Sequence, residues 1–240
     1  MSELETLQSW IDESRSIVFF GGAGVSTESG IKDFRSPDGL YSQQYKFPPE
    51  TMLSRSFFDA HPEEFFRFYR DKMLNPGAEP NAAHKKLAEL EAAGKLRSVV
   101  TQNIDGLHQA AGSKRVWELH GSVLRNYCMK CGKSYPTSAV AESAGVPRCS
   151  CGGIIKPDVV LYEESLDSHV IEGALQDIQQ ADMLIIGGTS LVVYPAAGLV
   201  NYYRGDRLVL INKSPTPYDR KADLVLTGAI GEILGQIRVS

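Results

Sequence analysis

The sequence lacks the features that would place a protein in a membrane or on nucleic acid. Its longest apolar runs, such as residues 183–186, are far too short to cross a bilayer. The first residues, MSELETLQSWIDESR, are amphipathic and acidic, unlike an export signal. The formal net charge is -4, and lysine and arginine form no basic stripe. We therefore expect a cytoplasmic protein with no membrane association and no direct nucleic-acid partner.

Cysteine is scarce, and all the cysteines fall within one short segment. Cys128 and Cys131 have the spacing of a zinc ribbon, whereas Cys149 and Cys151 are one residue closer than the usual pair. Without an export signal a metal is favoured over disulfides, and the clustering argues against unrelated buried thiols. Because four thiolates leave no open position for water, we predict one structural Zn²⁺ rather than a catalytic metal.

Residues 17–36, IVFFGGAGVSTESGIKDFRS, begin as a buried strand and turn sharply at a glycine pair. We expect a helix N-terminus after this turn, where free amides and the helix dipole would favour a phosphate. The dinucleotide fingerprint G-x-G-x-x-G is incomplete, because Gly22 and Gly24 fit but Thr27 replaces the third glycine. The segment favours a nucleotide site and leaves a tight structural turn as the alternative.

Strand-like and helix-like segments alternate along most of the chain. Apolar runs predict strands at 96–101, 116–119, 183–187, 208–211 and 224–226. Amphipathic patterns and capping residues predict helices at 62–74, 81–93, 168–180, from 195 and at 229–237. This alternation is typical of an α/β fold, and we predict a Rossmann-like, doubly wound, mostly parallel sheet with a smaller zinc-binding and helical domain inserted.

The predicted domain boundaries follow the changes in composition. Two segments interrupt the α/β alternation: a long loop that leads into the aromatic helix at 62–74, and the cysteine-containing segment, which has little apolar periodicity. We assign 36–75 to the loop and the helical part of the small domain, and 122–157 to the zinc-binding module. The Rossmann-like domain would then comprise 1–35, 76–121 and 158–240.

Polar or glycine clusters follow five of the predicted strands. In a doubly wound sheet, ligands bind beyond the carboxyl ends of the strands, so these clusters should share one edge. Any one of them would be a weak signal, because Asn is a common turn former and a lone His is usually structural. The clusters are Gly22-Ala23-Gly24, Gln102-Asn103-Ile104-Asp105, His120-Gly121, Gly188-Thr189-Ser190 and Asn212-Lys213. The histidines outside them, His61, His84, His108 and His169, are expected to be structural.

Several of these motifs together resemble one family. GAGVSTESGIKDFRS, TQNIDGLH, the HG after a strand, the paired cysteines, GTSLVVYP and the IN of LVLINKS occur in the order and spacing of the sirtuins. The resemblance covers the whole chain and implies an NAD-dependent protein lysine deacylase that acts on acetylated or otherwise acylated lysines.

The resemblance implies a role for each motif in binding NAD. Arg35 would lie near the diphosphate and Phe34 over the nicotinamide ribose, while Asp105 would accept from the carboxamide and Gln102 would hold ribose hydroxyls. The predicted cofactor contacts are Gly22, Ala23, Gly24, Ser26, Thr27, Asp33, Phe34, Arg35, Gln102, Asn103, Ile104, Asp105, His120, Gly188, Thr189, Ser190, Asn212, Lys213 and Ile230.

The resemblance also assigns the catalytic residues. His120 would be the general base that deprotonates a ribose hydroxyl, a task that suits an imidazole near neutral pH. Asn103 would order the ribose and the attacking water. The products would be lysine, nicotinamide and 2'-O-acetyl-ADP-ribose. The alternatives are protein mono-ADP-ribosyl transfer, against which His120 argues, and a non-catalytic NAD-sensing module, which would need no base.

The implied substrate contacts lie at residues 159–162 and at Val193, where the acylated peptide would add as an extra strand. The usual family text there is close to V-x-F-G-E, so Tyr162 and Glu163 depart from it, as Lys32 departs from a proline in the cofactor loop. Desuccinylating relatives carry a Tyr-x-x-Arg pair where this chain has Phe66 and Tyr69. An uncharged, aromatic pocket should prefer neutral acyl groups.

Overall fold

The computed structural model describes residues 2–34, 39 and 46–239. It contains a six-stranded sheet in which every neighbouring pair is parallel. The strand order is β3 (Val116–Glu118), β2 (Leu96–Thr101), β1 (Ile17–Gly21), β7 (Met183–Gly187), β8 (Leu208–Asn212) and β9 (Leu224–Thr227). This is the Rossmann order, with the topological switch point between β1 and β7, and it confirms the predicted fold class.

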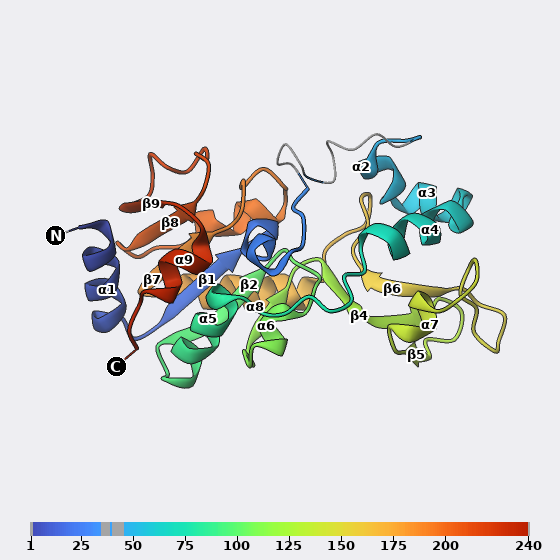
Figure 1. The fold of residues 1–240 in the computed structure, drawn as a ribbon, viewed down its shortest axis with the longest axis horizontal. Helices are drawn as coiled ribbons and strands as arrows, with labels where there is room; N and C mark the ends of the chain where they lie inside the picture. The colour runs from blue at the N-terminus through green and yellow to red at the C-terminus, as the bar shows by residue number, and fades with distance from the viewer. Residues whose placement is uncertain (1, 35–38, 40–45, 240) are drawn as a thin grey trace.

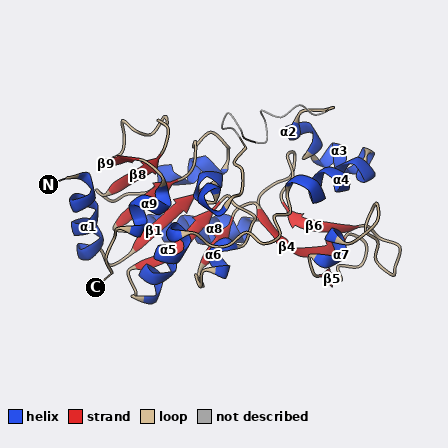
Figure 2. Ribbon diagram, in the orientation of Figure 1, coloured by secondary structure: helices blue, strands red, loops and turns tan. Residues whose placement is uncertain are grey.

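Helices cover both faces of this sheet (Figure 2). On one face, residues of the strands such as Phe19 and Ile185 pack with α1 (Glu3–Glu13), α5 (Ala82–Ala92) and α9 (Ile230–Gly235). On the other face, the neighbouring residues Phe20 and Ile186 pack with α8 (Ser168–Gln180) and the 3₁₀ helix η4 (Ala196–Tyr202). The central strands β1 and β7 are therefore buried on both sides, which explains their unbroken apolar sequences.

A second, smaller core lies at the other end of the elongated molecule (Figure 1). It packs α2 (Pro49–Met52), α3 (Arg55–Ala60) and α4 (Pro62–Lys72) against an antiparallel sheet. That sheet has the order β5 (Ser134–Tyr135), β4 (Gly121–Cys128) and β6 (Ile155–Val159), and α7 (Ser138–Ala141) lies between β5 and β6 in the chain. The proposed boundaries at 121/122 and 157/158 cut this sheet near its end, where Gly121 pairs with Val159.

The local structure differs from the sequence prediction in three places. Directly after β1, residues 22–30 form no α-helix; instead two 3₁₀ helices, η1 (Ala23–Val25) and η2 (Thr27–Ser29), end at Gly30, whose φ of 82° favours glycine. The predicted loop contains α2 and α3, which are too short to show a periodic pattern. The segment after Pro195 is a 3₁₀ rather than an α-helix. Among the described helices, none is long and apolar enough to cross a membrane.

Candidate active site

One cavity of about 1040 Å³ opens at the carboxyl ends of β1, β2, β7 and β8, between the two cores. Its volume lies at the upper end of the range for ligand sites. Its lining includes every predicted cofactor, catalytic and substrate residue that the structure describes. They are Gly22, Ala23, Gly24, Ser26, Thr27, Asp33, Phe34, Gln102, Asn103, Ile104, Asp105, His120, Val159, Val160, Leu161, Tyr162, Gly188, Thr189, Ser190, Val193, Asn212, Lys213 and Ile230. Arg35 lies outside the described residues.

The floor of the cavity is formed where the loop after β1 meets the loop after β7. Gly24 N–H donates to the Gly188 carbonyl at 2.8 Å, and a Cβ on Gly24 would lie 2.8 Å from the Gly188 main chain. A Cβ on Gly22 would lie 2.9 Å from Thr189 Cβ. These glycines are therefore required for the two loops to touch, and the contact sets the width of the cavity at the switch point.

Hydrogen bonds between residues at the ends of different strands orient the polar groups of the cavity. Thr189 N–H donates to Asn212 Oδ1 at 3.1 Å, and Asn212 Nδ2 donates back to the Thr189 carbonyl at 2.8 Å. Gln102 Nε2 donates to Thr189 Oγ1 at 3.1 Å. The amide and hydroxyl groups that follow β2, β7 and β8 are thus linked along one edge, as suits a ligand with hydroxyls along its length.

Asp105 lines the cavity, and hydrogen bonds hold its side chain. Its Oδ2 accepts from Ser26 Oγ at 2.6 Å, and its Oδ1 accepts from the Leu107 amide at 2.9 Å. Ser26 Oγ in turn accepts from Asn103 Nδ2 at 3.1 Å, and Asn103 is buried. Because one donor holds each oxygen, the Asp105 side chain has a defined orientation, and its remaining lone pairs can accept from an amide or hydroxyl ligand.

His120 lies between β3 and β4, and its ring orientation is fixed by the main chain. Nδ1 lies 3.0 Å from the Gln102 carbonyl, which can only accept, so the neutral ring carries its proton on Nδ1 and leaves Nε2 with a free lone pair. Burial lowers the pKa of His120, and the hydrogen bond to Gln102 opposes this shift. The residue is therefore a neutral base at physiological pH.

The segment after β6 forms the wall opposite the glycine loops. Val160 N–H donates to the His120 carbonyl at 3.0 Å, which ties the catalytic candidate to this wall. Tyr162 pairs with the small domain, since its N–H donates to the Leu53 carbonyl and its carbonyl accepts from Arg55 N–H, each at 3.0 Å. The wall is thus an extended segment anchored at both ends.

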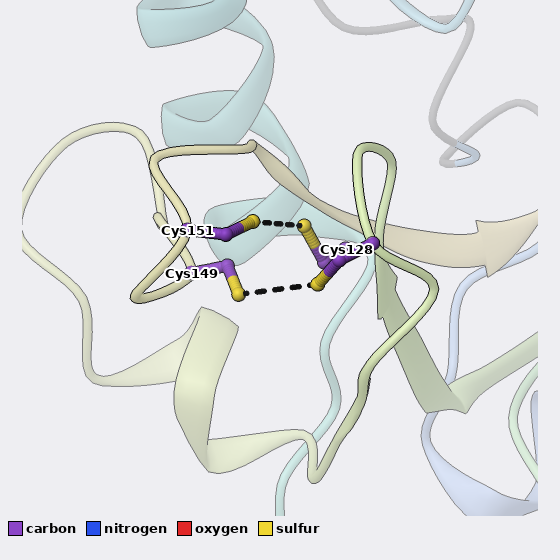
Figure 3. Close-up of side chains that lie close together, drawn as sticks. Cys128, Cys149 and Cys151 are labelled. Carbon is purple, nitrogen blue, oxygen red and sulfur yellow. Dashed lines mark hydrogen bonds between the residues drawn. The ribbon is translucent and has the colours of Figure 1, made fainter.

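The four cysteines converge at the far end of β4 and β6 (Figure 3). Their sulfur atoms all lie within 4.8 Å of one another, with Cys128 and Cys151 3.4 Å apart and Cys131 and Cys149 3.6 Å apart. A disulfide would need an S–S distance of about 2.05 Å. A tetrahedral zinc site with Zn–S distances of about 2.3 Å places the sulfur atoms about 3.8 Å apart. The cluster therefore fits one thiolate-bound Zn²⁺.

Two neighbours donate to the sulfur atoms. The Lys130 amide donates to Cys128 Sγ at 3.4 Å, and Tyr135 Oη donates to Cys149 Sγ at 3.0 Å. Such outer contacts orient metal ligands and stabilise thiolates. Because no open ligand position remains, the cluster is suited to holding β4 and β6 together and not to catalysis.

A model of the Sir2 family matches residues 22–195, from the glycine turn to the loop after β7. The chain belongs to the Sir2 family. A protein of Clostridium perfringens named NAD-dependent protein deacetylase is 61% identical over 239 residues, which cover 98% of each chain. A protein of Staphylococcus aureus N315 with the same name is 48% identical over 227 residues, covering 94% of this chain and 93% of the relative.

Solved Sir2 structures share the fold over almost the whole chain. A structure of Sir2 with a p53 peptide and NAD⁺ has a TM-score of 0.84 and 41% identity, covering 98% of this chain and 96% of that chain. A structure of Sir2Tm bound to a propionylated peptide has a TM-score of 0.85 and 40% identity, with the same coverage. These matches confirm the predicted family.

Some residues that line the Sir2 cavity are absent from the predicted site. They come from the end of α4 and the turns after it, from the loop after β8, and from the segment beyond the substrate wall: Tyr69, Lys72, Met73, Asn75, Ser214, Pro215, Thr216 and Leu166. Only Tyr69 had a signal in the sequence, as one of the aromatics of helix 62–74. The others lack a motif, because their position depends on how the small core packs against the sheet.

Proposed function

We propose that the chain catalyses NAD-dependent deacetylation of lysine side chains in proteins and yields lysine, nicotinamide and 2'-O-acetyl-ADP-ribose. The observation that carries this proposal is the neutral, oriented His120 in one cavity with Asn103 and Asp105. The relatives named NAD-dependent protein deacetylase support it, as do the Sir2 structures with peptide and NAD⁺.

The polar groups of the cavity fit the parts of NAD. We assign the carboxamide to Asp105, the ribose hydroxyls to Gln102 and Asn103, and the adenosine side to the linked Thr189 and Asn212. Ser190, Lys213 and Ile230 would complete the adenosine side, and Ala23, Thr27, Asp33, Phe34 and Arg35 the nicotinamide and diphosphate side. When bound, NAD supplies an electrophilic ribose carbon once nicotinamide leaves.

The catalytic role of the chain is to remove one proton from a ribose hydroxyl. His120 Nε2 accepts the proton of a ribose hydroxyl, while Nδ1 remains bonded to the Gln102 carbonyl, so the imidazolium that forms keeps a hydrogen-bond partner. Burial favours the neutral ring and raises the driving force for returning this proton.

The acylated peptide would lie along residues 159–162 and Val193 as an added strand. The acyl group would then enter a cavity in which Tyr69 stands where desuccinylating relatives carry the arginine, which supports the preference for neutral acyl groups. We also propose a cytoplasmic location, because the four cysteines form no disulfide and fit a thiolate zinc site, which a reducing compartment preserves.

The alternatives predict different products. Mono-ADP-ribosyl transfer would leave ADP-ribose on a protein and would not need an acylated lysine. A non-catalytic NAD-sensing module would release no nicotinamide. Incubation with NAD and an acetyl-lysine peptide separates the three: we expect nicotinamide release only when the acetylated peptide is present. Release with unmodified peptide, or none with any of several acyl peptides, would contradict the deacetylase.

A further inference from the structure

Glu163 adopts a backbone conformation that suits glycine. Its φ is 75°, in the left-handed region, and glycine is the residue of the usual family text at this position. A residue with a side chain in this region costs about 1–2 kcal/mol. Glu163 is exposed, follows the substrate wall directly and lines the main cavity. A strained residue beside a binding surface suggests that its side chain has a use there.

The side chain of Glu163 is held in one orientation by the start of α3. Oε2 accepts from the Ser56 amide and Oε1 accepts from Ser56 Oγ, each at 2.9 Å. These charge-assisted bonds offset part of the backbone strain. The carboxylate is therefore fixed in position and still exposed, with lone pairs left for another donor.

Glu163 offers free main-chain groups directly after the substrate wall. The N–H and C=O of Leu161 both bond to Glu164, and those of Tyr162 bond to Leu53 and Arg55. In the part of the chain that the structure describes, the N–H and C=O of Glu163 have no such partner. Among the described residues the Val160 carbonyl also accepts no hydrogen bond, so a peptide that adds as a strand can pair along residues 160–163. Pairing at Glu163 brings the peptide side chains within reach of the carboxylate.

The charge of Glu163 is not neutralised by the protein. Glu164 has two cations, Arg55 at 3.1 Å and the buried Lys156 at 3.2 Å, whereas Glu163 forms no ion pair with any described residue. On the GTSLVVYP side of the cavity the neighbours are uncharged. The other charged residues that line the cavity come from the segment after η2, from α4 and from the loops after β2 and β8: Lys32, Asp33, Lys72, Asp105 and Lys213.

We propose that Glu163 makes the enzyme select acyl-lysine sites with a basic side chain next to the acylated lysine. This inference rests on the proposed deacetylase function. The carboxylate attracts an arginine or lysine on the bound peptide and repels an aspartate or glutamate. Since the contact lies on the peptide surface and not at the ribose, it acts on substrate binding and leaves the chemical step unchanged.

The test uses acetyl-lysine peptides that differ only at the residues flanking the acetyl-lysine, which are arginine, alanine or glutamate. At low salt we expect kcat/KM to be about two- to tenfold higher for the arginine peptide than for the glutamate peptide, mostly through KM. High salt should reduce the ratio, because it screens exposed charges. Glu163→Gln keeps groups that can bond to Ser56, and its ratio should fall toward one.

Two further variants separate charge from structure. Glu172→Gln removes an exposed carboxylate on α8 and should keep the wild-type ratio. Glu163→Gly relieves the strained backbone, and it should lose the selectivity while it deacetylates the alanine peptide. Equal kcat/KM for the arginine and glutamate peptides in the wild type, or an unchanged ratio in Glu163→Gln, would overturn the inference and leave the deacetylase function intact. Absence of deacetylation with every peptide would instead contradict the function.

Discussion

His84 on α5 and His108 on the short helix α6 (Leu107–Ala110), which follows Asp105 in the chain, form a buried histidine pair. Their ring centroids are 4.7 Å apart, and both side chains are almost completely buried. Both ring nitrogens of His108, and Nε2 of His84, lack a hydrogen-bond partner among the described residues. Burial, and then the neighbouring His84, lower the pKa of His108 to about 3. Burial also lowers the pKa of His84, opposed by Asp105 and Glu28.

This shift makes the folded protein sensitive to acid. In the unfolded chain His108 has a pKa of about 6.5, so between pH 6.5 and about 3 the unfolded state binds one more proton than the folded state. The contribution of the neutral, buried His108 to the free energy of unfolding is fully present above pH 6.5. It decreases as the pH falls from 6.5 toward about 3. At pH 5, which is about 1.5 units below the unfolded pKa, His108 lowers the free energy of unfolding by about 2 kcal/mol relative to neutral pH.

The assay compares urea unfolding at pH 7 and pH 5 in wild type and His108→Gln. Glutamine does not titrate, and any constant cost of its buried amide cancels between the two pH values. We expect the wild type to lose about 2 kcal/mol more than the variant between pH 7 and pH 5. His169→Gln, at an exposed position on α8, controls for the loss of one histidine and should behave as wild type. An equal loss in wild type and His108→Gln would refute the reasoning.

Three more perturbations test the site and its supports. His120→Ala should lower kcat by about 10²- to 10⁴-fold while NAD binding, measured by calorimetry, persists; full turnover would remove His120 from the role of base. Cys128→Ser or a chelator should lower the melting temperature of the small core, and an unchanged melting profile would show that no metal stabilises it. Gly24→Ala should destabilise the protein by about 1–3 kcal/mol in urea unfolding, because its Cβ would meet the Gly188 main chain at 2.8 Å; a neutral effect would contradict that packing.

The large domain could be predicted from the sequence because its signals are local. The apolar sequences of β1 and β7 arise from burial on both faces, and Asn81 caps α5 at the position where the pattern begins. Polar residues after strands must meet at one edge of a parallel sheet, so the five strand-end clusters of the site could be expected from the fold. Thr27, Phe34, Ile230 and the substrate wall could be expected only from the resemblance to the sirtuins.

The remaining features depend on contacts between distant segments. The glycine turn becomes 3₁₀ helices because Gly24 must bond to Gly188, which lies across the switch point. The short α3 is stabilised where Ser56 meets Glu163, a pairing that no local pattern contains. The conformation of Glu163 itself, with a φ of 75°, could not be read from a sequence in which glutamate disfavours that region.

The central claim is that this cavity transfers the acetyl group of a lysine to the ribose of NAD. The most direct measurement follows a peptide whose lysine carries a radiolabelled acetyl group during a single turnover with NAD. The account predicts that the label moves to ADP-ribose and that nicotinamide and deacetylated peptide appear in equal amounts. Label released directly as free acetate without nicotinamide, or label that stays on the peptide while nicotinamide is released, would contradict it.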